Sequence, residues 1–325
     1  MRTEKLVDPR LLNILRCPAS GQKLHVENDQ LVSSDGIKRY SVIDGIPCMM
    51  RKHAPPTHQG YIDLLQENVT EESFAEMSDA EAIKFVQAML VATCGNLFRG
   101  GNLDRVVPLP DIPAGLPDGR ILDVGCNWGR WSMALAKAGR QVIGVDIHLK
   151  SLMAARRISR QLALDNEPLF VLGDARYLPF SPMAFDGVFS YSVIQHFSKA
   201  NAATILSEIA KVMKQQATSM IQMPNRAGIR SRLSLLRRGY SEGVEFDVRY
   251  YSIVELLQLF ASKIGKSKVS VDCFFGLNVH MYDRKFISAE KRWIVYLADL
   301  ALQASQRVPS LGNFSDSVFV VSTKN

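Results

Sequence analysis

The sequence lacks any apolar run near the about 18 residues that a membrane-spanning helix requires. Its start, Met-Arg-Thr-Glu-Lys, carries charges of both signs and leads into no apolar core, so it does not resemble a secretory signal. Cysteine is scarce, and the 5 cysteines are scattered and odd in number, which excludes a disulfide framework. We therefore expect reduced thiols and a cytoplasmic protein.

The chain also lacks an extreme charge balance. Its net charge of +7 is modest for 325 residues, and 47% hydrophobic with 22% charged residues is typical of a globular protein. A chain of this length is long enough for two domains. The most notable basic cluster follows a predicted strand and comprises Arg226, Arg230, Arg232, Arg237 and Arg238. Such a cluster is usually a solvated face, and its place at the end of a strand favours contact with an anionic substrate as the alternative.

What the sequence does contain is a glycine turn between a buried strand and a helix. Ile121-Leu-Asp-Val leads into Gly125-Cys-Asn-Trp-Gly129, and Asp146 ends the next apolar strand. Glycine lets the backbone approach a ligand closely, and the helix that follows directs its first amides at an anionic group. An acid at the tip of the neighbouring strand can accept hydrogen bonds from both hydroxyls of a ribose. The pattern predicts a nucleoside-binding α/β site.

The dinucleotide fingerprint G-x-G-x-x-G is incomplete, because Asn127 and Arg130 replace its second and third glycines. Asparagine tolerates a left-handed backbone, so the turn can still form, but Trp128 and Arg130 would crowd a pyrophosphate. The segments that follow alternate as strand, strand, helix and strand, at residues 169–172, 185–190, 199–213 and 217–223.

With Gly173-Asp174-Ala175 after the third of these strands, residues 118–225 resemble the class I S-adenosylmethionine-dependent methyltransferases, particularly the small-molecule branch. The resemblance implies an α/β fold with a Rossmann-like seven-stranded sheet and helices on both faces. It implies S-adenosylmethionine as methyl donor, S-adenosylhomocysteine as product, and no metal. It also implies a set of residues around the donor: Asp123, Gly125, Cys126, Asn127, Gly129, Asp146, Ile147, Asp174, Ala175, Ser190 and Ser192.

Within this set the resemblance assigns individual roles. Asp123, with the glycines of the turn, would shape the methionine end, and Asp146 would hold the ribose diol. Asp174 would accept from the adenine amino group, and the Ala175 amide would face a ring nitrogen. Ser190 and Ser192 would border the methionine moiety. The alternative is that these acids are ordinary helix caps.

Residues 1–52 predict a small β-rich module with short alternating strands. Its Cys17-Pro and Asp44-Gly-Ile-Pro segments resemble the zinc-ribbon-like activator of several tRNA and translation-factor methyltransferases. Ser20 replaces the second cysteine of the first pair, and Ser33 and Ser34 lie where the second pair would be. Zinc needs four strong ligands, so we expect no zinc. The module would serve packing, homodimerisation or the substrate wall.

The remaining chain divides around the predicted nucleotide core. Residues 53–117 predict a linker and N-terminal helices that cover the donor site, and residues 118–325 the methyltransferase domain. Within that domain, residues 226–250 predict an inserted, irregular lid, and residues 280–314 a helical insertion. In that insertion, Ile294, Leu297, Ala301 and Ala304 form a stripe that predicts the buried face of a helix. The alternative is a face in peripheral contact with a membrane.

The best candidate for a general base is His196, just past the fourth strand, because histidine exchanges protons near neutral pH. The alternative is a histidine that bonds backbone beside the donor. Weaker candidates are Tyr191 for catalysis and, for the acceptor pocket, Arg99, Arg249, Tyr250, Tyr251 and His280.

Three functions from different classes remain. The first is a small-molecule methyltransferase, with a hydroxyl favoured over an amine, serving a natural product, glycan or lipid-linked precursor. The second is an RNA methyltransferase that grips phosphates with the N-terminal module and basic lid. Ser190-Tyr-Ser-Val, in place of a base-directed Pro-Pro-Tyr element, disfavours nucleic acid. The third is a non-catalytic protein that binds the donor.

Overall fold

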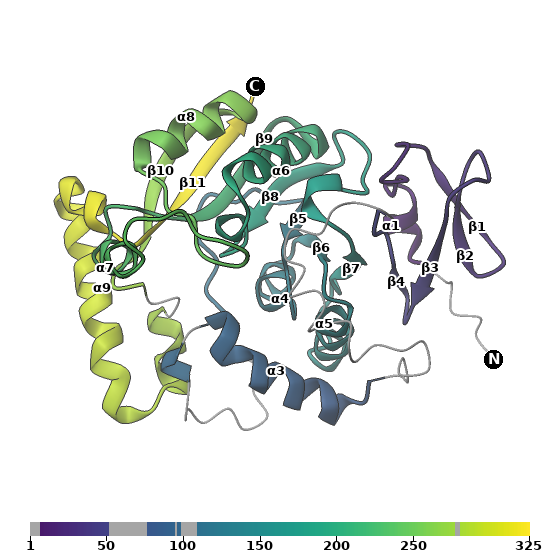
Figure 1. Cartoon of the computed structure of the whole chain (residues 1–325). Coiled ribbons are helices and arrows are strands. Elements are labelled where there is room, and N and C mark those ends of the chain that lie inside the picture. The colour runs from purple at the N-terminus through teal and green to yellow at the C-terminus, as the bar shows by residue number, and fades with distance from the viewer. Residues whose placement is uncertain (1–6, 52–76, 95, 99–108, 277–279) are drawn as a thin grey trace.

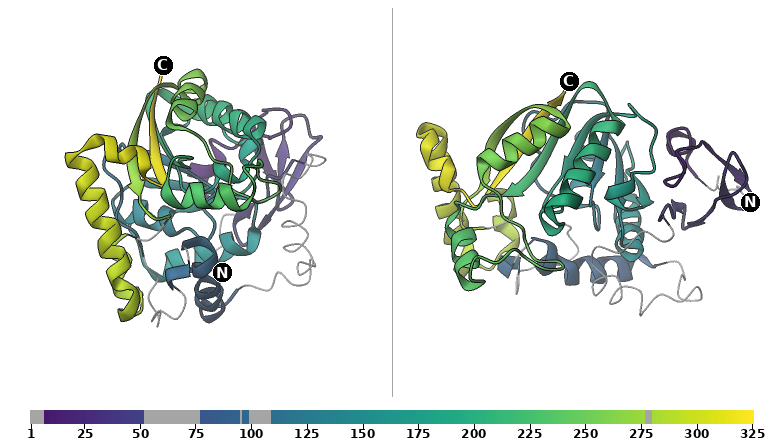
Figure 2. Two further views of the ribbon diagram at one scale, coloured as in Figure 1. Left: turned by 60° about the vertical axis from the view of Figure 1, so that its left-hand side comes forward. Right: turned by 45° about the horizontal axis from the view of Figure 1, so that its top comes forward.

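The computed structural model describes residues 7–51, 77–94, 96–98, 109–276 and 280–325. These residues form a 7-stranded sheet flanked by helices and a separate 4-stranded sheet near the N-terminus (Figures 1 and 2). The predicted α/β architecture with a small β-rich N-terminal module is therefore confirmed. No helix within these described ranges is long and apolar enough to cross a membrane.

The central sheet has the order β10-β11-β9-β8-β5-β6-β7. Strands β5 to β9 are parallel, and β11 lies antiparallel between β9 and β10. This topology brings the carboxyl ends of β5, β6, β8, β9 and β10 to one edge of the sheet. The strands are β5 (Arg120–Val124), β6 (Gln141–Asp146), β7 (Leu169–Leu172), β8 (Phe185–Ser190), β9 (Met213–Pro224), β10 (Gly265–Cys273) and β11 (Ser317–Lys324).

Helices cover both faces of this sheet because its central parallel strands β5, β6 and β8 are largely buried on both sides. Helices α4 (Arg130–Lys137) and α5 (Leu149–Gln161) pack on one face, and α6 (Lys199–Val212) and α8 (Ile253–Lys263) on the other (Figure 1). Their starts follow local signals. Ser252 and Glu255 form a capping box at α8, which stabilises a helix by about 1 kcal/mol.

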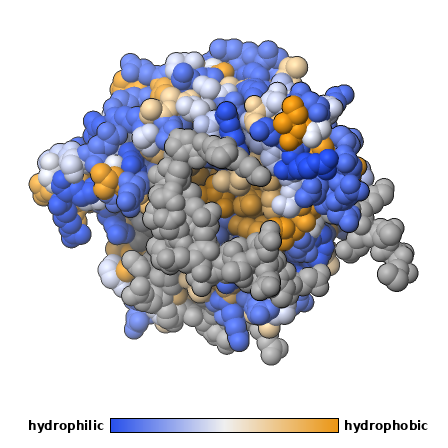
Figure 3. Space-filling model, turned by 45° about the vertical axis from the view of Figure 1, so that its right-hand side comes forward, coloured by the Kyte–Doolittle hydropathy of each residue, from blue (hydrophilic) through white to orange (hydrophobic). Residues whose placement is uncertain are grey.

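The N-terminal module contains α1 (Pro9–Leu12) and four antiparallel strands, β1 (Leu24–Glu27), β2 (Gln30–Ser33), β3 (Arg39–Ile43) and β4 (Ile46–Pro47). It packs against the edge strand β7, where the Met49 amide donates to the Leu172 carbonyl at 2.7 Å. Arg156 of α5 forms an ion pair with Asp44 at 2.7 Å. The module thus has the packing role that the sequence indicated, and homodimerisation through it stays a prediction. Seen from the side nearer this module, the described surface is largely hydrophilic around a central apolar area (Figure 3).

Ahead of β5, helix α3 (Asp79–Cys94) lies along α5, with the Phe85 ring 5.9 Å from that of His148. Val86 and Leu90 are buried, so the helix packs against the core through an apolar face. The short helix η2 (Asn96–Phe98) follows, and the Arg130 guanidinium lies 5.8 Å from the centre of the Phe98 ring. Residues 53–76, the first part of the predicted linker and N-terminal helices, lie outside the described residues.

The prediction of an irregular lid over residues 226–250 is wrong in part, because this segment contains helix α7 (Ile229–Arg237). The residue before the helix is Gly228, which has no capping side chain. Its cap comes from Asp316 instead, whose Oδ1 accepts from the Arg230 and Ser231 amides at 2.7 and 3.0 Å. Because this cap is 85 residues away in the chain, no local sequence pattern predicts the start of the helix.

The predicted helical insertion contains η5 (Met281–Phe286), η6 (Ala289–Lys291), α9 (Arg292–Arg307) and η7 (Pro309–Phe314). The predicted buried stripe of α9 is wrong in part, since Leu297 is 48% exposed whereas Ile294, Ala301 and Ala304 are half-buried. The buried residues are Val295, Ala298 and Ser305. The helix is apolar around much of its circumference, and only the side that meets β10 and the short helices is covered. Sequence periodicity could not decide which side that would be.

Candidate active site

The turn after β5 adopts the left-handed backbone that its glycines allow, with φ of +75° at Gly125 and +77° at Gly129. A Cβ at Gly125 would lie 2.3 Å from a methyl carbon of Val193, so no larger residue fits. Asn127 also has a positive φ of 47°. Its side-chain oxygen accepts from the Trp128 amide at 2.8 Å, which stabilises the conformation locally. The expectation that asparagine can replace glycine in this turn is confirmed.

Asp146, at the end of β6, lies directly beside this turn. Its Oδ2 accepts from the Asn127 amide and its Oδ1 from the His148 amide, both at 2.9 Å. Burial raises the pKa of this carboxyl, and the amide hydrogen bonds oppose that rise. A carboxylate has about four lone-pair positions, so about two remain to receive further donors. This is the capacity that a ribose diol requires.

Asp123, on β5, is 2% exposed and accepts from the Ser132 hydroxyl at 2.6 Å. Burial raises the pKa of its carboxyl to about 7, the Ser132 hydrogen bond lowers it, and the nearby Asp146 raises it. An approaching cation would favour the ionised form of such a group. The site thus has an acid that is ready to pair with an ammonium group.

Asp174 follows β7, but the structure gives it a partner that the sequence did not announce. Its Oδ1 accepts from the Arg176 amide at 2.8 Å and from Arg176 Nε at 3.1 Å. Its Oδ2 accepts from the same Nε at 3.1 Å and from a terminal nitrogen at 2.6 Å. Both side chains are buried. The four lone-pair positions of the carboxylate are thereby occupied in this conformation.

The two serines near the end of β8 differ in their surroundings. Ser190 is 1% exposed, and its hydroxyl donates to the Val124 carbonyl at 2.8 Å, so it ties β8 to β5. Ser192 has a positive φ of 62°, and its amide donates to the Gln222 side chain at 3.0 Å. The remaining predicted neighbours of the donor line the same strand ends. Cys126 and Ala175 are buried, and Ile147 is half-buried.

His196, the predicted base, holds the lid. Its Nδ1 is 2.7 Å from the Phe246 carbonyl, and its ring stacks on the Phe246 ring with centres 4.1 Å apart. Its Nε2 is 3.3 Å from the side-chain nitrogen, Nε2, of Gln195. Both ring nitrogens have protein partners, and the alternative that this histidine bonds backbone matches the contacts.

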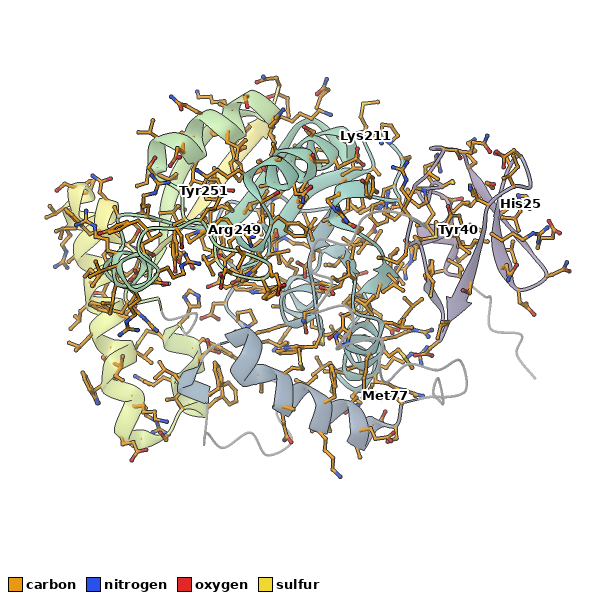
Figure 4. All side chains as sticks on the ribbon, viewed as in Figure 1. His25, Tyr40, Met77, Lys211, Arg249 and Tyr251 are labelled. Atoms are coloured by element: carbon orange, nitrogen blue, oxygen red, sulfur yellow. The ribbon has the colours of Figure 1, made fainter. Side chains whose placement is uncertain are left out.

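Arg249 fixes the same part of the lid from the other side. Its guanidinium donates to the carbonyls of His196, Glu245 and Asp247 at 2.8, 2.5 and 2.7 Å. It is 7% exposed and lies close to the buried Tyr251 (Figure 4). These bonds join the lid to the helical turn after β8.

A polar cluster, of which the sequence predicted only Tyr191 and His280, lies at the ends of β8 and β10 and at the start of β11. The Tyr191 hydroxyl donates to Asp272 Oδ2 at 3.1 Å and is 3.3 Å from His280 Nε2. The Ser317 hydroxyl donates to Asp272 Oδ2 at 2.7 Å, and Asp272 Oδ1 is 3.6 Å from His280 Nε2. Burial and the charge of Asp272 raise the pKa of Tyr191 well above its usual value. The Tyr191 hydroxyl therefore stays protonated and donates a hydrogen bond.

The short helix η5 positions His280 in this cluster. The His280 amide donates to Asp283 Oδ2 at 3.1 Å, and Asp283 Oδ1 accepts from Arg130 of α4 at 2.5 Å. Asp272 and Ser317 meet because β10 and β11 pair antiparallel, with Cys273 opposite Ser317. The two residues are 45 apart in the chain, and no local motif marks either one. The structure therefore adds Asp272 and Ser317 to the predicted Tyr191 and His280.

A cavity of about 340 Å³ opens between the lid, α6 and the segment after β9. Four cationic side chains line it: Lys199, Arg226, Arg238 and Arg249. Glu255 partly offsets them, with ion pairs to Lys199 at 3.1 Å and to Arg226 at 3.6 Å.

Of the two tyrosines predicted for the acceptor pocket, one lines this cavity and the other is buried. Tyr250 lines it, whereas Tyr251 is 2% exposed, and burial raises the pKa of its hydroxyl to about 12. Within the described part of the chain, that hydroxyl has no hydrogen-bond partner. The predicted Arg99 lies outside the described residues. No cluster of three or more potential metal ligands occurs among the residues that are described.

Comparison with known proteins places this strand-end arrangement in a family. Residues 121–216 match the family model described as "Methyltransferase domain". The chain contains a class I S-adenosylmethionine-dependent methyltransferase domain. The matched segment runs from the start of β5 into β9, so it includes the turn, Asp123, Asp146 and Asp174.

Two curated relatives show how far the similarity extends. The biotin biosynthesis bifunctional protein BioHC of Cellvibrio japonicus is 37% identical over 103 residues, 32% of this chain and 19% of that protein. The magnesium-protoporphyrin O-methyltransferase of Synechocystis is 31% identical over 112 residues, 34% of this chain and 47% of that protein. The chain thus matches less than half the length of these relatives.

Among solved structures, the magnesium protoporphyrin IX methyltransferase of Synechocystis with bound S-adenosylhomocysteine is 17% identical and has a TM-score of 0.43. The similarity covers 75% of this chain and 83% of that chain. The N-terminal module, the lid and the helical insertion all lie outside the segment that the family model matches.

Proposed function

We propose that this chain transfers a methyl group from S-adenosylmethionine to a hydroxyl oxygen of a small molecule. The observation that carries the proposal is Asp146, which two backbone amides hold with about two lone-pair positions left. It occupies the end of β6, inside the segment that matches the methyltransferase model. An acid that only caps a helix accepts hydrogen bonds from amides of that helix, whereas Asp146 also accepts one from the Asn127 amide of the neighbouring turn.

The residues around the turn fit the two charged ends of the donor. Asp123 offers a buried carboxyl whose pKa of about 7 leaves it readily ionised beside an ammonium group. Gly129 ends the turn at the start of α4, and the positive end of that helix suits the carboxylate of the methionine moiety. If Asp174 binds the adenine of the methyl donor, Arg176 must either share the Asp174 carboxylate with the adenine or move away from it.

The donor, when bound, supplies an electrophilic methyl group on a sulfonium. The chain must then align the acceptor, which supplies several kcal/mol, and accept the proton of its hydroxyl. We assign the proton to His280, because histidine exchanges protons near neutral pH. Asp272 would stabilise the resulting imidazolium from 3.6 Å. Tyr191 would hold the imidazole through the 3.3 Å contact to its Nε2. We prefer it to His196 because His280 lies beside a carboxylate that can stabilise an imidazolium, whereas the ring nitrogens of His196 face the Phe246 carbonyl and the Gln195 side chain.

The acceptor itself is expected to carry an anionic group. The cavity beside the lid offers Arg226 and Arg238 at its wall, and each of them also has an acidic neighbour, at 3.6 Å. A carboxylate or phosphate could exchange with those neighbours at little cost, because exposed ion pairs contribute only about 0–1 kcal/mol. The O-methyltransferases among the partial relatives are consistent with a hydroxyl acceptor.

A search for the product tests the proposal directly. Purified protein and methyl-labelled S-adenosylmethionine would be added to a small-molecule extract, and labelled products identified by mass spectrometry and NMR. We expect one labelled compound with an O-methyl group and an anionic substituent. Label on an amine nitrogen or in an RNA fraction would refute the proposed acceptor. Donor binding without turnover on any fraction would favour the non-catalytic alternative.

A further inference from the structure

The exposed apolar side chains of this protein are concentrated in its C-terminal part. Most of the large apolar side chains that are exposed in the described structure fall in residues 229–246 and 293–314. Those two segments contain α7 with the lid, α9 and η7. Single exposed apolar residues need no explanation, but such a concentration marks an interaction surface.

Helix α7 has its apolar stripe on the outside. Ile229, Leu233 and Leu236 are 54%, 47% and 61% exposed, and their spacing places them on one face. The buried residues of the helix are Ser231 and Leu235. A helix of a globular protein normally directs the larger apolar stripe inwards, so α7 is inverted relative to that rule.

Helix α9 repeats the pattern. Trp293 and Leu300 are both 59% exposed, and Tyr296 and Leu297 are 45% and 48% exposed. The spacing of these residues also places them on one face, opposite to the buried Val295 and Ala298. Two helices of the same region therefore present apolar faces to solvent.

The short helix η7 joins these two faces. It packs against α9, and the Arg232 guanidinium of α7 lies 5.9 Å from the centre of its Phe314 ring. Phe314 and Leu311 of η7 are themselves 47% and 40% exposed. Figure 1 draws α7 and α9 at the same side of the molecule. We call the exposed residues of α7, η7 and α9 the C-terminal apolar surface.

Positive charge accompanies this surface. Residues 226–240 contain five arginines and no acidic residue. On α7, the exposed Arg230, Arg232 and Arg237 alternate with the exposed apolar residues. Two copies of such a surface would repel each other, which disfavours a second copy of this chain as the occupant. A nucleic acid would match the arginines but would leave the leucines and Trp293 uncovered.

We propose that the C-terminal apolar surface binds an anionic lipid bilayer at its interface. Helices with apolar and aromatic residues between basic ones lie in the headgroup region of such bilayers, and each basic residue near the surface adds to the attraction. The cavity beside the lid shares Arg238 with this region. Docking would therefore bring the cavity close to headgroups or to lipid-linked molecules. This proposal goes beyond methyl transfer and does not depend on it.

Vesicle binding of the full chain provides the test. Vesicles of phosphatidylcholine alone would be compared with vesicles that contain phosphatidylglycerol, at low and high salt. We expect sedimentation with the anionic vesicles only, weakened by salt. Tryptophan fluorescence gives a second readout, because Trp293 is 59% exposed while Trp128 and Trp131 are 1% and 9% exposed. Its emission should shift to the blue and be quenched by brominated lipid.

Matched variants separate the two components of the surface. The double variant Arg232→Gln and Arg237→Gln should weaken binding to anionic vesicles about thirtyfold, because each basic residue contributes a factor of roughly five. Leu233→Gln with Leu236→Gln should abolish the fluorescence shift. Val254→Gln, at a side chain that is 62% exposed on α8, is the control and should bind like the wild type.

Three outcomes would overturn the proposal. The first is no binding to either vesicle, and the second is equal binding by the wild type and the leucine variant. The third is a concentration-dependent dimer, or an RNA complex, that the leucine variant disrupts in the absence of lipid. Thermal unfolding and S-adenosylhomocysteine binding, measured on the same samples, show whether each variant is folded. They also separate failure of this proposal from failure of the proposed methyl transfer.

Discussion

Arg176 binds both carboxylate oxygens of Asp174, the acid that the sequence assigns to the adenine ring. Both side chains are buried, so the pair is a structural element as well as a barrier to the assigned role. If Asp174 accepts from adenine, then Arg176 and the donor compete for the same lone pairs.

This competition predicts opposite effects for two variants. Arg176→Gln should bind S-adenosylhomocysteine at least as tightly as the wild type, since it frees lone pairs of Asp174. Asp174→Ala should weaken binding roughly 10- to 150-fold, because a lost hydrogen bond to a charged group costs about 1.5–3 kcal/mol. Both should lower stability, by about 3–5 kcal/mol if the remaining charge stays buried. Calorimetry and thermal unfolding measure the two effects separately. Equal loss of binding in both variants would contradict this competition and would show that the site requires the intact ion pair.

The pKa of Asp123 predicts a pH dependence of folding. Because burial raises this pKa to about 7, above its ordinary unfolded value of about 3.9, the folded state holds the proton more tightly. The contribution is fully present below about pH 4 and is lost as the pH rises through about 7. Asp123→Asn should remove this pH dependence. The measurement is the free energy of unfolding of both proteins from pH 4 to 8, and parallel curves would contradict the prediction.

The same group predicts proton release when the donor product binds. The ammonium group of S-adenosylhomocysteine favours ionised Asp123, so binding below about pH 7 should release up to about one proton. Calorimetry in buffers with different ionisation enthalpies counts that proton. Asp123→Asn is the control and should release none through this group. No difference between the two proteins would remove Asp123 from the methionine end of the site.

Catalysis by His280 predicts a kinetic asymmetry between the two histidines. His280→Gln should lower kcat about 10²–10⁴-fold and remove the limb of the pH profile that reports the base. His196→Gln should act mainly by loosening the lid, which would raise KM more than it lowers kcat. Turnover with labelled donor, once the acceptor is identified, gives both constants. A larger loss of kcat in His196→Gln would restore the assignment made from the sequence.

We expect the hydrogen bonds of Arg249 to stabilise the lid. Arg249→Met removes the donors to the carbonyls of His196, Glu245 and Asp247. A hydrogen bond from a charged donor contributes about 1.5–3 kcal/mol, so the segment around Glu245 should open more often when these bonds are lost. Limited proteolysis should cut it faster than in the wild type. Arg237→Met, at an exposed arginine on α7, is the control, and equal cleavage of the two variants would contradict the predicted role.

The part of the site that the sequence could predict is the part that depends on local signals. The turn from Gly125 to Gly129 is recognisable from residues that tolerate a left-handed backbone. Asp146 is recognisable from its place at the end of an apolar strand. The cluster of Asp272, Ser317 and His280 could not be predicted, because it depends on the antiparallel pairing of β10 with β11. The start of α7 likewise depends on a cap from Asp316.

The most direct measurement is a calorimetric titration of S-adenosylhomocysteine into the wild type, Asp146→Ala and Asp165→Ala. Asp165 is an exposed acid on the loop after α5 and serves as the matched control. We predict a Kd on the order of micromolar for the wild type and for Asp165→Ala. Asp146→Ala should show no measurable binding while retaining a cooperative unfolding transition. An unchanged Kd in folded Asp146→Ala would contradict the account.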